Sequence, residues 1–395
     1  MFIDVATTIR VLCRYARRIT PSCSLCQPWY RLAVIDTAYR LAKPALFRLD
    51  PEAVHDRTIA ALGRISRTTK ATTVLSRAAL SPDPRLAVNL AGISLPGPIG
   101  IAAGLDKNGV AFPALSALGW DIVEVGTITL KPQPGNPKPR VFRLPEDQAL
   151  INRMGFPGLG ADVIERNLLE RKRSGVPVAC NIGPNKSSVE AGLDGVIADC
   201  RLLAARFAAF ASYLVLNISS PNTARLRDLQ GKEALRVLLR EVKAAIPAHA
   251  PVPLFVKIAP DMADAELDDV VEVVMETGLA GIVATNTTIA RPGTLRDAHR
   301  IETGGLSGAP LRSRSLDVVR RIARVSEGKV EIVAVGGISS SEDVLNAIMA
   351  GATMVQIYTG LIYGGPALAN KIKRDLLAHL DRVGTNSLND LRRLP

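Results

Sequence analysis

Aromatic residues, cysteines and long apolar runs are all scarce in this sequence, and each scarcity excludes a class of protein. Phe, Trp and Tyr make up only 4% of the 395 residues, which argues against a site built from stacked aromatic rings. Five cysteines are too few for a disulfide framework, and one C-x-x-C pair, Cys23 and Cys26, has no second pair to complete a metal site. No stretch of about 20 mostly apolar residues occurs, so we expect no membrane-spanning helix.

The charge of the chain is unevenly distributed. The net charge is +12, and residues 1–80 alone carry 13 basic and 5 acidic residues. A basic chain could bind nucleic acid, a membrane surface or small anions. Nucleic-acid binding is disfavoured because the basic residues are not interleaved with aromatic ones. Basic charge concentrated in an amphipathic N-terminal region instead favours the surface of an anionic membrane.

Three regions are predicted along the chain. Residues 1–30 form a basic extension, which could be a targeting peptide, a membrane-touching arm or a segment of little structural consequence; we expect the last. Residues 31–80 predict a helical domain: an amphipathic helix over 31–49 that Pro44 would kink or divide, then a helix capped by Asp50. These helices could simply pack on the main domain or form a lid that touches a membrane. Residues 81–395 form the main domain.

Eight short apolar segments alternate with helical segments in the main domain. The segments are Pro98–Gly104, Asp121–Thr127, Val176–Gly183, Tyr213–Ser219, Pro253–Pro260, Gly281–Thr287, Glu331–Ile338 and Met354–Gly360. They are rich in Val and Ile and do not alternate with polar residues, as expected of parallel strands covered on both faces. The count and spacing predict an α/β fold, a (β/α)₈ TIM barrel with a small N-terminal helical domain. A doubly wound sheet is disfavoured because no dinucleotide or P-loop glycine motif occurs.

The predicted strand ends carry amides and hydroxyls where a barrel enzyme has its active site. Asn152, Asn181, Asn217 and Asn286 should face one mouth of the barrel, with Asn222 just beyond them. A ring of amides can recognise the edges of a flat polar ligand.

Glycines and a buried lysine add an anionic ligand to this prediction. Gly337 lies at the end of the seventh predicted strand, and Tyr358, Thr359 and Gly360 lie at the end of the eighth, where barrels usually bind phosphate. Lys257, inside the fifth strand, needs a negative partner, which a reduced flavin could supply. The predicted ligand is therefore a planar ring that bears a phosphate, with a smaller polar molecule against it.

The proton-transfer group is harder to identify, because no pair of carboxylates or histidines falls at the strand ends. Ser220 is the hydroxyl best placed for the task, and Thr223 could relay the proton. A serine base needs a dry, preorganised site. The alternative is that residues 219–222 form an ordinary turn.

Several long motifs together resemble one enzyme family. They are Leu105–Lys107 after Ala-Ala-Gly, Thr129–Arg140, Ile151–Phe156, Asn217–Thr223, Val283–Thr288, Thr303–Gly308 and Gln356–Gly360. In these motifs the chain resembles dihydroorotate dehydrogenase over about residues 31–380. Ser220, where the soluble enzymes have cysteine, and the N-terminal helices resemble the quinone-dependent, membrane-associated class 2.

The resemblance implies FMN as cofactor and the oxidation of (S)-dihydroorotate to orotate in pyrimidine synthesis. Ser220 would take the C5 proton, with Thr223 and Phe156 beside its exit path, and the C6 hydride would pass to the flavin. The implied FMN-binding residues are Ala103, Gly104, Lys107, Thr127, Asn181, Asn217, Lys257, Thr285, Gly308, Gly337, Tyr358 and Thr359. The implied substrate-binding residues are Lys107, Asn152, Arg153, Met154, Gly155, Phe156, Asn217, Asn222, Asn286 and Thr287.

The resemblance also implies a membrane quinone that enters between the helices and the barrel, beside His55, Arg143 and Tyr358. The expected location is the cytoplasmic face of the bacterial inner membrane, with peripheral attachment. Two alternatives remain at this point: a soluble flavin enzyme that uses fumarate or NAD, and a non-catalytic barrel that binds a phosphorylated ligand.

Overall fold

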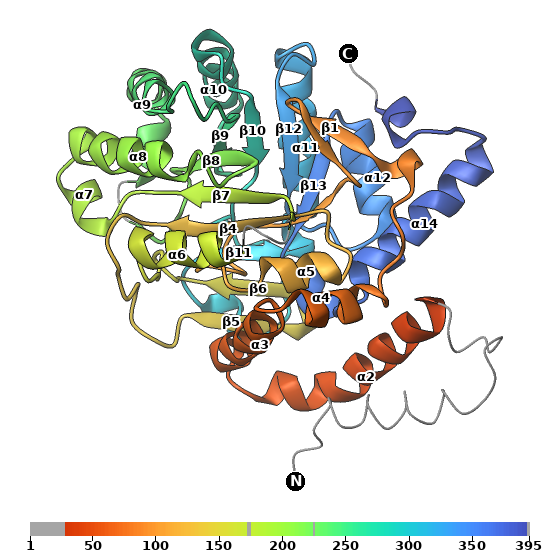
Figure 1. Cartoon of the computed structure of the whole chain (residues 1–395). Helices are drawn as coiled ribbons and strands as arrows, with labels where there is room; N and C mark the ends of the chain where they lie inside the picture. The colour runs from red at the N-terminus through yellow and green to blue at the C-terminus, as the bar shows by residue number, and fades with distance from the viewer. Residues whose placement is uncertain (1–27, 172–174, 224–225, 393–395) are drawn as a thin grey trace.

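A closed barrel of eight parallel strands forms the centre of the computed structural model, which describes residues 28–171, 175–223 and 226–392 (Figure 1). Its strands are β3 (Ile99–Ile101), β4 (Ile122–Ile128), β7 (Val178–Ile182), β8 (Tyr213–Asn217), β9 (Leu254–Ile258), β10 (Gly281–Ala284), β12 (Glu331–Val335) and β13 (Met354–Ile357). Each lies within or beside one of the eight predicted segments and follows the order of the chain around the barrel. The predicted TIM barrel is therefore confirmed.

Helices cover the outside of the barrel, which explains why its strands are apolar on both faces. All seven residues of β4 are buried, for example. The covering helices are α5 (Phe112–Ala117), α6 (Ala161–Arg171), α7 (Lys186–Glu190), α8 (Leu193–Phe207), α9 (Lys232–Ala244), α10 (Asp264–Thr277), α11 (Arg312–Val325), α12 (Ser341–Met349), α13 (Thr359–Gly364) and α14 (Leu368–Val383).

Three helices precede the barrel, and Figure 1 shows them gathered at one end of it. They are α2 (Pro28–Arg48), α3 (Pro51–Ile65) and α4 (Thr69–Ser76). Asp50 caps α3 as predicted, because its Oδ1 accepts a hydrogen bond from Ala53 N at 2.8 Å. The expectation that Pro44 could divide the first helix is wrong, since α2 runs through it. Among the described residues, no helix is both long and apolar enough to cross a bilayer.

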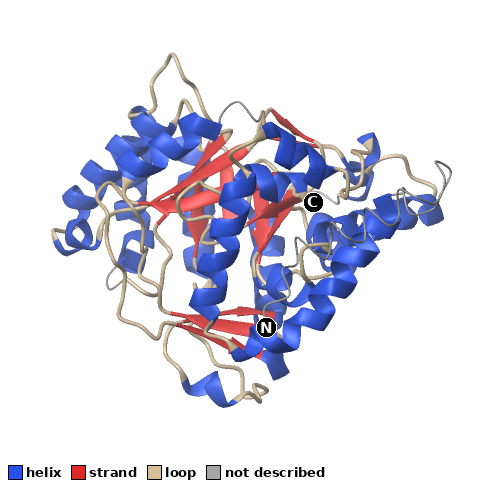
Figure 2. Ribbon diagram, turned by 60° about the horizontal axis from the view of Figure 1, so that its bottom comes forward, coloured by secondary structure: helices blue, strands red, loops and turns tan. Residues whose placement is uncertain are grey.

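The two ends of the barrel are closed by elements that the sequence did not reveal. The hairpin of β1 (Val88–Leu90) and β2 (Ile93–Leu95) packs buried leucines against the barrel interior, near Tyr213 and Phe255. At the opposite end, β5 (Val141–Leu144), β6 (Ala149–Asn152) and β11 (Gly305–Gly308) form a separate antiparallel sheet (Figure 2). This sheet contacts α3 through β5, so it joins the helices to the mouth of the barrel.

The predicted extension, residues 1–30, lies almost wholly outside the described residues, as do Cys23 and Cys26. The domain boundaries at 30 and 80 remain predictions.

Candidate functional site

One cavity of about 480 Å³ lies between the carboxyl ends of the barrel strands and the helices α2 and α3. Most of the predicted site residues line it. They are His55, Ala103, Gly104, Lys107, Thr127, Arg143, Asn152, Met154, Gly155, Phe156, Asn217, Ser220, Asn222, Lys257, Thr285, Asn286, Thr287, Gly308, Gly337, Tyr358 and Thr359. Residues that the resemblance assigned to cofactor, substrate and quinone thus surround a single space.

Three of the predicted residues, Arg153, Asn181 and Thr223, do not line the cavity. Arg153 points to the exterior, where its Nη1 donates to Glu302 at 2.8 Å and its guanidinium lies over the ring of Phe142. Thr223 is buried, with 8% of its surface exposed. Asn181 lies behind the cavity wall, where it contacts residues that do line it.

Asn181 holds two of the cavity-lining residues in place. Its Oδ1 accepts hydrogen bonds from the Thr127 hydroxyl at 2.6 Å and from Asn217 Nδ2 at 3.1 Å. Its own amide donates to Glu124 Oε1 at 2.7 Å. Because all of these groups are buried, the network fixes which polar atoms of Thr127 and Asn217 face the cavity.

Glu124 is a buried carboxylate of the candidate site that sequence analysis missed. It is fully buried in β4 and accepts a second hydrogen bond from Gln356 Nε2. Burial lowers the pKa of Lys257, and the negative charge of Glu124 opposes that decrease. Part of the negative charge that Lys257 needs is therefore supplied by the protein. The available signal was a carboxylate in the middle of a segment predicted to be a buried strand.

The wall of the cavity retains an unused hydrogen-bond acceptor. In the described part of the chain, only Trp120 Nε1 and Gln356 Oε1 are buried side-chain polar atoms without a hydrogen-bond partner. Gln356 and Lys257 both line this cavity. A polar heterocycle placed there would supply the donor that Gln356 lacks and take a hydrogen bond from Lys257.

Two glycines of the cavity wall lie where a side chain would not fit. Gly308 and Gly337 have φ angles of +97° and +71°. A Cβ on Gly308 would lie 2.4 Å from Gln148 O, and one on Gly337 would lie 2.6 Å from Arg312 Cα. Gly308 lies close to Thr359, whose hydroxyl lies 2.8 Å from that of Ser307. Such a cradle of backbone and hydroxyl groups suits a phosphate.

Ser220 lies in a buried, hydrogen-bonded part of the cavity wall. It is 4% exposed, and its Oγ accepts a hydrogen bond from Asn222 N at 3.3 Å. Asn222 Nδ2 donates to Asn152 Oδ1 at 3.3 Å, and Asn286 Nδ2 donates to Ser219 Oγ at 3.0 Å. The structure therefore brings the proposed base and three of the predicted amides together. Burial at this level is what a serine base requires.

Lys107 and His55, predicted for different ligands, contact each other. Lys107 Nζ lies 3.0 Å from His55 Nε2. Burial, together with the positive charge of Lys107, lowers the pKa of His55 to about 3. Burial also lowers the pKa of Lys107 to about 8, although the carboxylates of Asp56 and Glu52 oppose the change. At neutral pH a neutral imidazole thus faces an ammonium group.

The part of the cavity beneath the helices is apolar. Leu46 and Phe47 of α2 and Ile59 and Leu62 of α3 line it. Polar side chains also reach this part of the cavity, among them Tyr39, His55 and Arg143. Arg143 Nη1 donates to Leu49 O at 2.9 Å, and its guanidinium lies over the Phe47 ring at 4.9 Å.

Comparison with known proteins identifies the family of this chain. The family model described as dihydroorotate dehydrogenase matches residues 85–380. The chain belongs to the dihydroorotate dehydrogenase family. A relative from Cereibacter sphaeroides, named dihydroorotate dehydrogenase (quinone), is 47% identical over 358 residues, which cover 88% of this chain and 95% of the relative. A relative of the same name from Chloroflexus aurantiacus is 45% identical and covers 85% of this chain and 95% of its own length.

A solved dihydroorotate dehydrogenase has the same architecture. The crystal structure of the enzyme from Eimeria tenella in complex with ferulenol superposes with a TM-score of 0.80 and 38% sequence identity. The match covers 88% of this chain and 98% of the other. Since residues 85–395 are less than 88% of the chain, the similarity to these dihydroorotate dehydrogenases includes part of the helical region before the barrel.

Proposed function

We propose that this chain is a quinone-dependent dihydroorotate dehydrogenase that uses FMN to oxidise (S)-dihydroorotate to orotate in pyrimidine synthesis. The observation that carries the proposal is the composition of the cavity. One end is lined by buried amides, hydroxyls and lysines, and the other mainly by aliphatic and aromatic side chains of α2 and α3. A polar heterocyclic substrate fits the first end, and a quinone ring with an apolar tail fits the second.

FMN suits the cradle between the two ends. Its phosphate would bind near Gly308, Gly337 and Thr359, and its ring edge would meet Lys257 and the unpaired Gln356 Oε1. When bound, FMN would accept the hydride from C6 of dihydroorotate and later deliver the electrons to a quinone. The remaining FMN contacts that we propose are Ala103, Gly104, Lys107, Thr127, Asn181, Asn217, Thr285 and Tyr358, with Asn181 acting through its hydrogen bonds to Thr127 and Asn217.

The substrate would be recognised by charge at one end and by amides along its edges. The ammonium group of Lys107 suits the carboxylate of dihydroorotate. Asn152, Asn217, Asn222 and Asn286 together offer both donors and acceptors to the imide and amide groups of the ring. Met154, Gly155, Phe156 and Thr287 complete this wall of the cavity, and Arg153 holds its loop from outside.

Ser220 is the proposed base. Oxidation to orotate removes a proton from C5 and a hydride from C6, and a C5=C6 double bond forms. Ser220 Oγ would take the C5 proton and pass it toward Thr223, beside Phe156, and then to solvent. The low exposure of Ser220 supports this assignment, because water would otherwise compete for the proton.

We assign the apolar end of the cavity to the quinone, with His55, Arg143 and Tyr358 as its polar contacts. Residues 31–80 would form the access domain and residues 81–395 the catalytic domain. Leu41 of α2 and Leu49, between α2 and α3, are 77% and 48% exposed, which supports peripheral contact with a membrane. The proposed site of that contact is the cytoplasmic face of a bacterial inner membrane.

An anaerobic titration tests the proposal. Dihydroorotate should bleach the flavin absorbance of the purified protein, and a water-soluble quinone analogue should restore it. If fumarate or NAD, and not the quinone analogue, restored the flavin absorbance, the chain would be the alternative soluble enzyme. Protein that binds FMN but is not bleached by dihydroorotate would overturn the proposed activity and leave a phosphate-binding barrel.

A further inference from the structure

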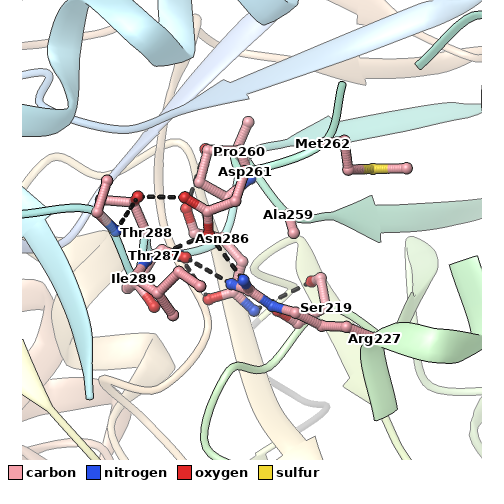
Figure 3. Close-up of polar contacts among 12 residues, drawn as sticks. Ser219, Arg227, Ala259, Pro260, Asp261, Met262, Asn286, Thr287, Thr288 and Ile289 are labelled. Atoms are coloured by element: carbon pink, nitrogen blue, oxygen red, sulfur yellow. Dashed lines mark hydrogen bonds and ion pairs between the residues drawn. The ribbon is translucent and has the colours of Figure 1, made fainter. Parts of the chain in front are cut away.

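Arg227 lies outside the cavity, yet it contacts two loops that form the cavity wall (Figure 3). It belongs to the short 3₁₀ helix Leu226–Gln230, which follows β8. Its Nε donates to the carbonyl oxygen of Ser219 at 3.1 Å, and its Nη2 donates to the carbonyl oxygen of Thr287 at 2.9 Å. Ser219 directly precedes the proposed base, and Thr287 is a proposed substrate contact.

The third contact of Arg227 is with the loop after a third strand, β9. Its Nη1 pairs with Asp261 Oδ2 at 2.7 Å, just beyond β9, the strand of Lys257. Asp261 also accepts hydrogen bonds from the Thr288 hydroxyl and from Ile289 N, the latter at 3.1 Å. The Arg227–Asp261 pair thus ties the loops after β8, β9 and β10 together, as the dashed contacts in Figure 3 show.

Arginine is the side chain suited to making these three contacts at once. A guanidinium group has five donors in one rigid plane, so it can bridge three acceptors at once. Lysine keeps the charge but presents it as a point on a flexible chain. Both side chains of the pair are about one-fifth exposed, which leaves the junction accessible to small solutes.

We propose that Arg227 is a positioning residue: it fixes the Ser220 backbone relative to the Thr287 segment, and so sets the distance between base and substrate. This inference rests on the proposed function, since it assumes Ser220 as the base. Arg227 does not line the cavity, so it acts through the Ser219 and Thr287 carbonyls. Small errors in such positioning have large effects on rate, on the order of 100-fold for 1 Å.

The test separates the two half-reactions in R227A, R227K and the control R236A. Arg236 also pairs with carboxylates, those of Glu233 and Glu276, but it joins helices α9 and α10 and does not line the cavity. With saturating dihydroorotate under anaerobic conditions, R227A should bleach about 10- to 100-fold more slowly than wild type. R227K should recover only part of this rate, and R236A should match wild type. Reoxidation of the dithionite-reduced variants by a quinone analogue should keep the wild-type rate.

Chemical rescue distinguishes positioning from general damage. Millimolar guanidinium chloride should accelerate bleaching in R227A but not in S220A, because only R227A lacks the bridging group. Bleaching of R227A at the wild-type rate would overturn the inference alone, as would equal slowing of both half-reactions. If R227A is purified without flavin, the rates of bleaching by dihydroorotate and of reoxidation by quinone are compared between R227K and wild type instead. Wild-type protein that dihydroorotate fails to bleach would overturn the proposed function as well, so the two failures are distinguishable.

Discussion

The two ends of the cavity are built by different means. The polar end is formed by residues at strand ends of one barrel, and its amides are held by buried hydrogen bonds such as Asn217 Nδ2 to Asn181 Oδ1. The apolar end is formed by α2 and α3, which precede the barrel in the chain. A few polar contacts anchor these helices, among them the ion pair between Glu52 and Arg140 at 2.7 Å.

This difference separates two tasks within one cavity. Proton and hydride transfer need atoms fixed to within fractions of an ångström, which a hydrogen-bonded barrel mouth provides. Binding a quinone needs apolar surface and a route from the membrane, and packed helices can supply both. We therefore expect substitutions at one end to change one half-reaction and leave the other intact.

The largest effect is expected for S220A. Loss of the base should slow flavin bleaching by dihydroorotate on the order of 10²- to 10⁴-fold, the range of general base catalysis. Stopped-flow absorbance under anaerobic conditions measures this rate. Ser326 is also buried but lies at the end of α11, so S326A is the matched control and should bleach normally. Bleaching of S220A at the wild-type rate would remove Ser220 from its proposed role.

The next largest effect concerns Lys107 and pH. Loss of a charged hydrogen bond to the substrate carboxylate should weaken orotate binding by K107M about 10- to 100-fold at pH 7. Burial lowers the pKa of Lys107 to about 8, so the ammonium form is present below this pH and is lost above it. Wild-type affinity should therefore fall as pH rises beyond 8, whereas K107M should show no such decline.

Titrating the flavin spectrum with orotate between pH 6 and 10 measures the orotate affinity of wild type and of K107M at each pH. The exposed Lys70 of α4 provides the control K70M, which should follow wild type. If the orotate affinity of K107M also fell above pH 8 by the same factor, a group other than Lys107 would control the pH dependence.

The barrel and its mouth could be predicted because they depend on local patterns. Eight apolar segments rich in Val and Ile appear directly in the sequence, and parallel strands place all their carboxyl ends at one mouth. Ser220, Asn217 and Lys257 lie where that logic puts them. The Asp50 cap was equally local, since the cap and its partner, Ala53, are three residues apart.

What could not be predicted depends on contacts between distant residues. Glu124 accepts a hydrogen bond from Gln356, 232 positions away, so a local pattern could suggest a buried carboxylate but not its partners. The sheet of β5, β6 and β11 joins strands separated by more than 150 residues. Arg153 belongs to a matching motif, but its side chain turns outward to Glu302, which only the packed structure reveals.

A moderate effect at the apolar end is expected for L62Q. Leu62 of α3 lines this end, and a glutamine there must lose water when the quinone ring binds. The KM for a quinone analogue should rise about tenfold, the equivalent of about 1.4 kcal/mol. L62M preserves volume and polarity and should stay near wild type. Slower bleaching by dihydroorotate in L62Q would contradict the independence of the two ends.

The smallest effect tests how independently the helices are held. Asp50 caps α3, the helix that carries His55 and Leu62, and D50A removes this cap at a cost of about 1 kcal/mol. Amide hydrogen exchange in α3 should then accelerate about fivefold, while exchange in β8 and β9 stays unchanged. D50N keeps an acceptor at the cap and should protect α3 nearly as well. Faster exchange in the barrel strands would mean that the two ends unfold as one unit, and the comparison between them would then lose its physical basis.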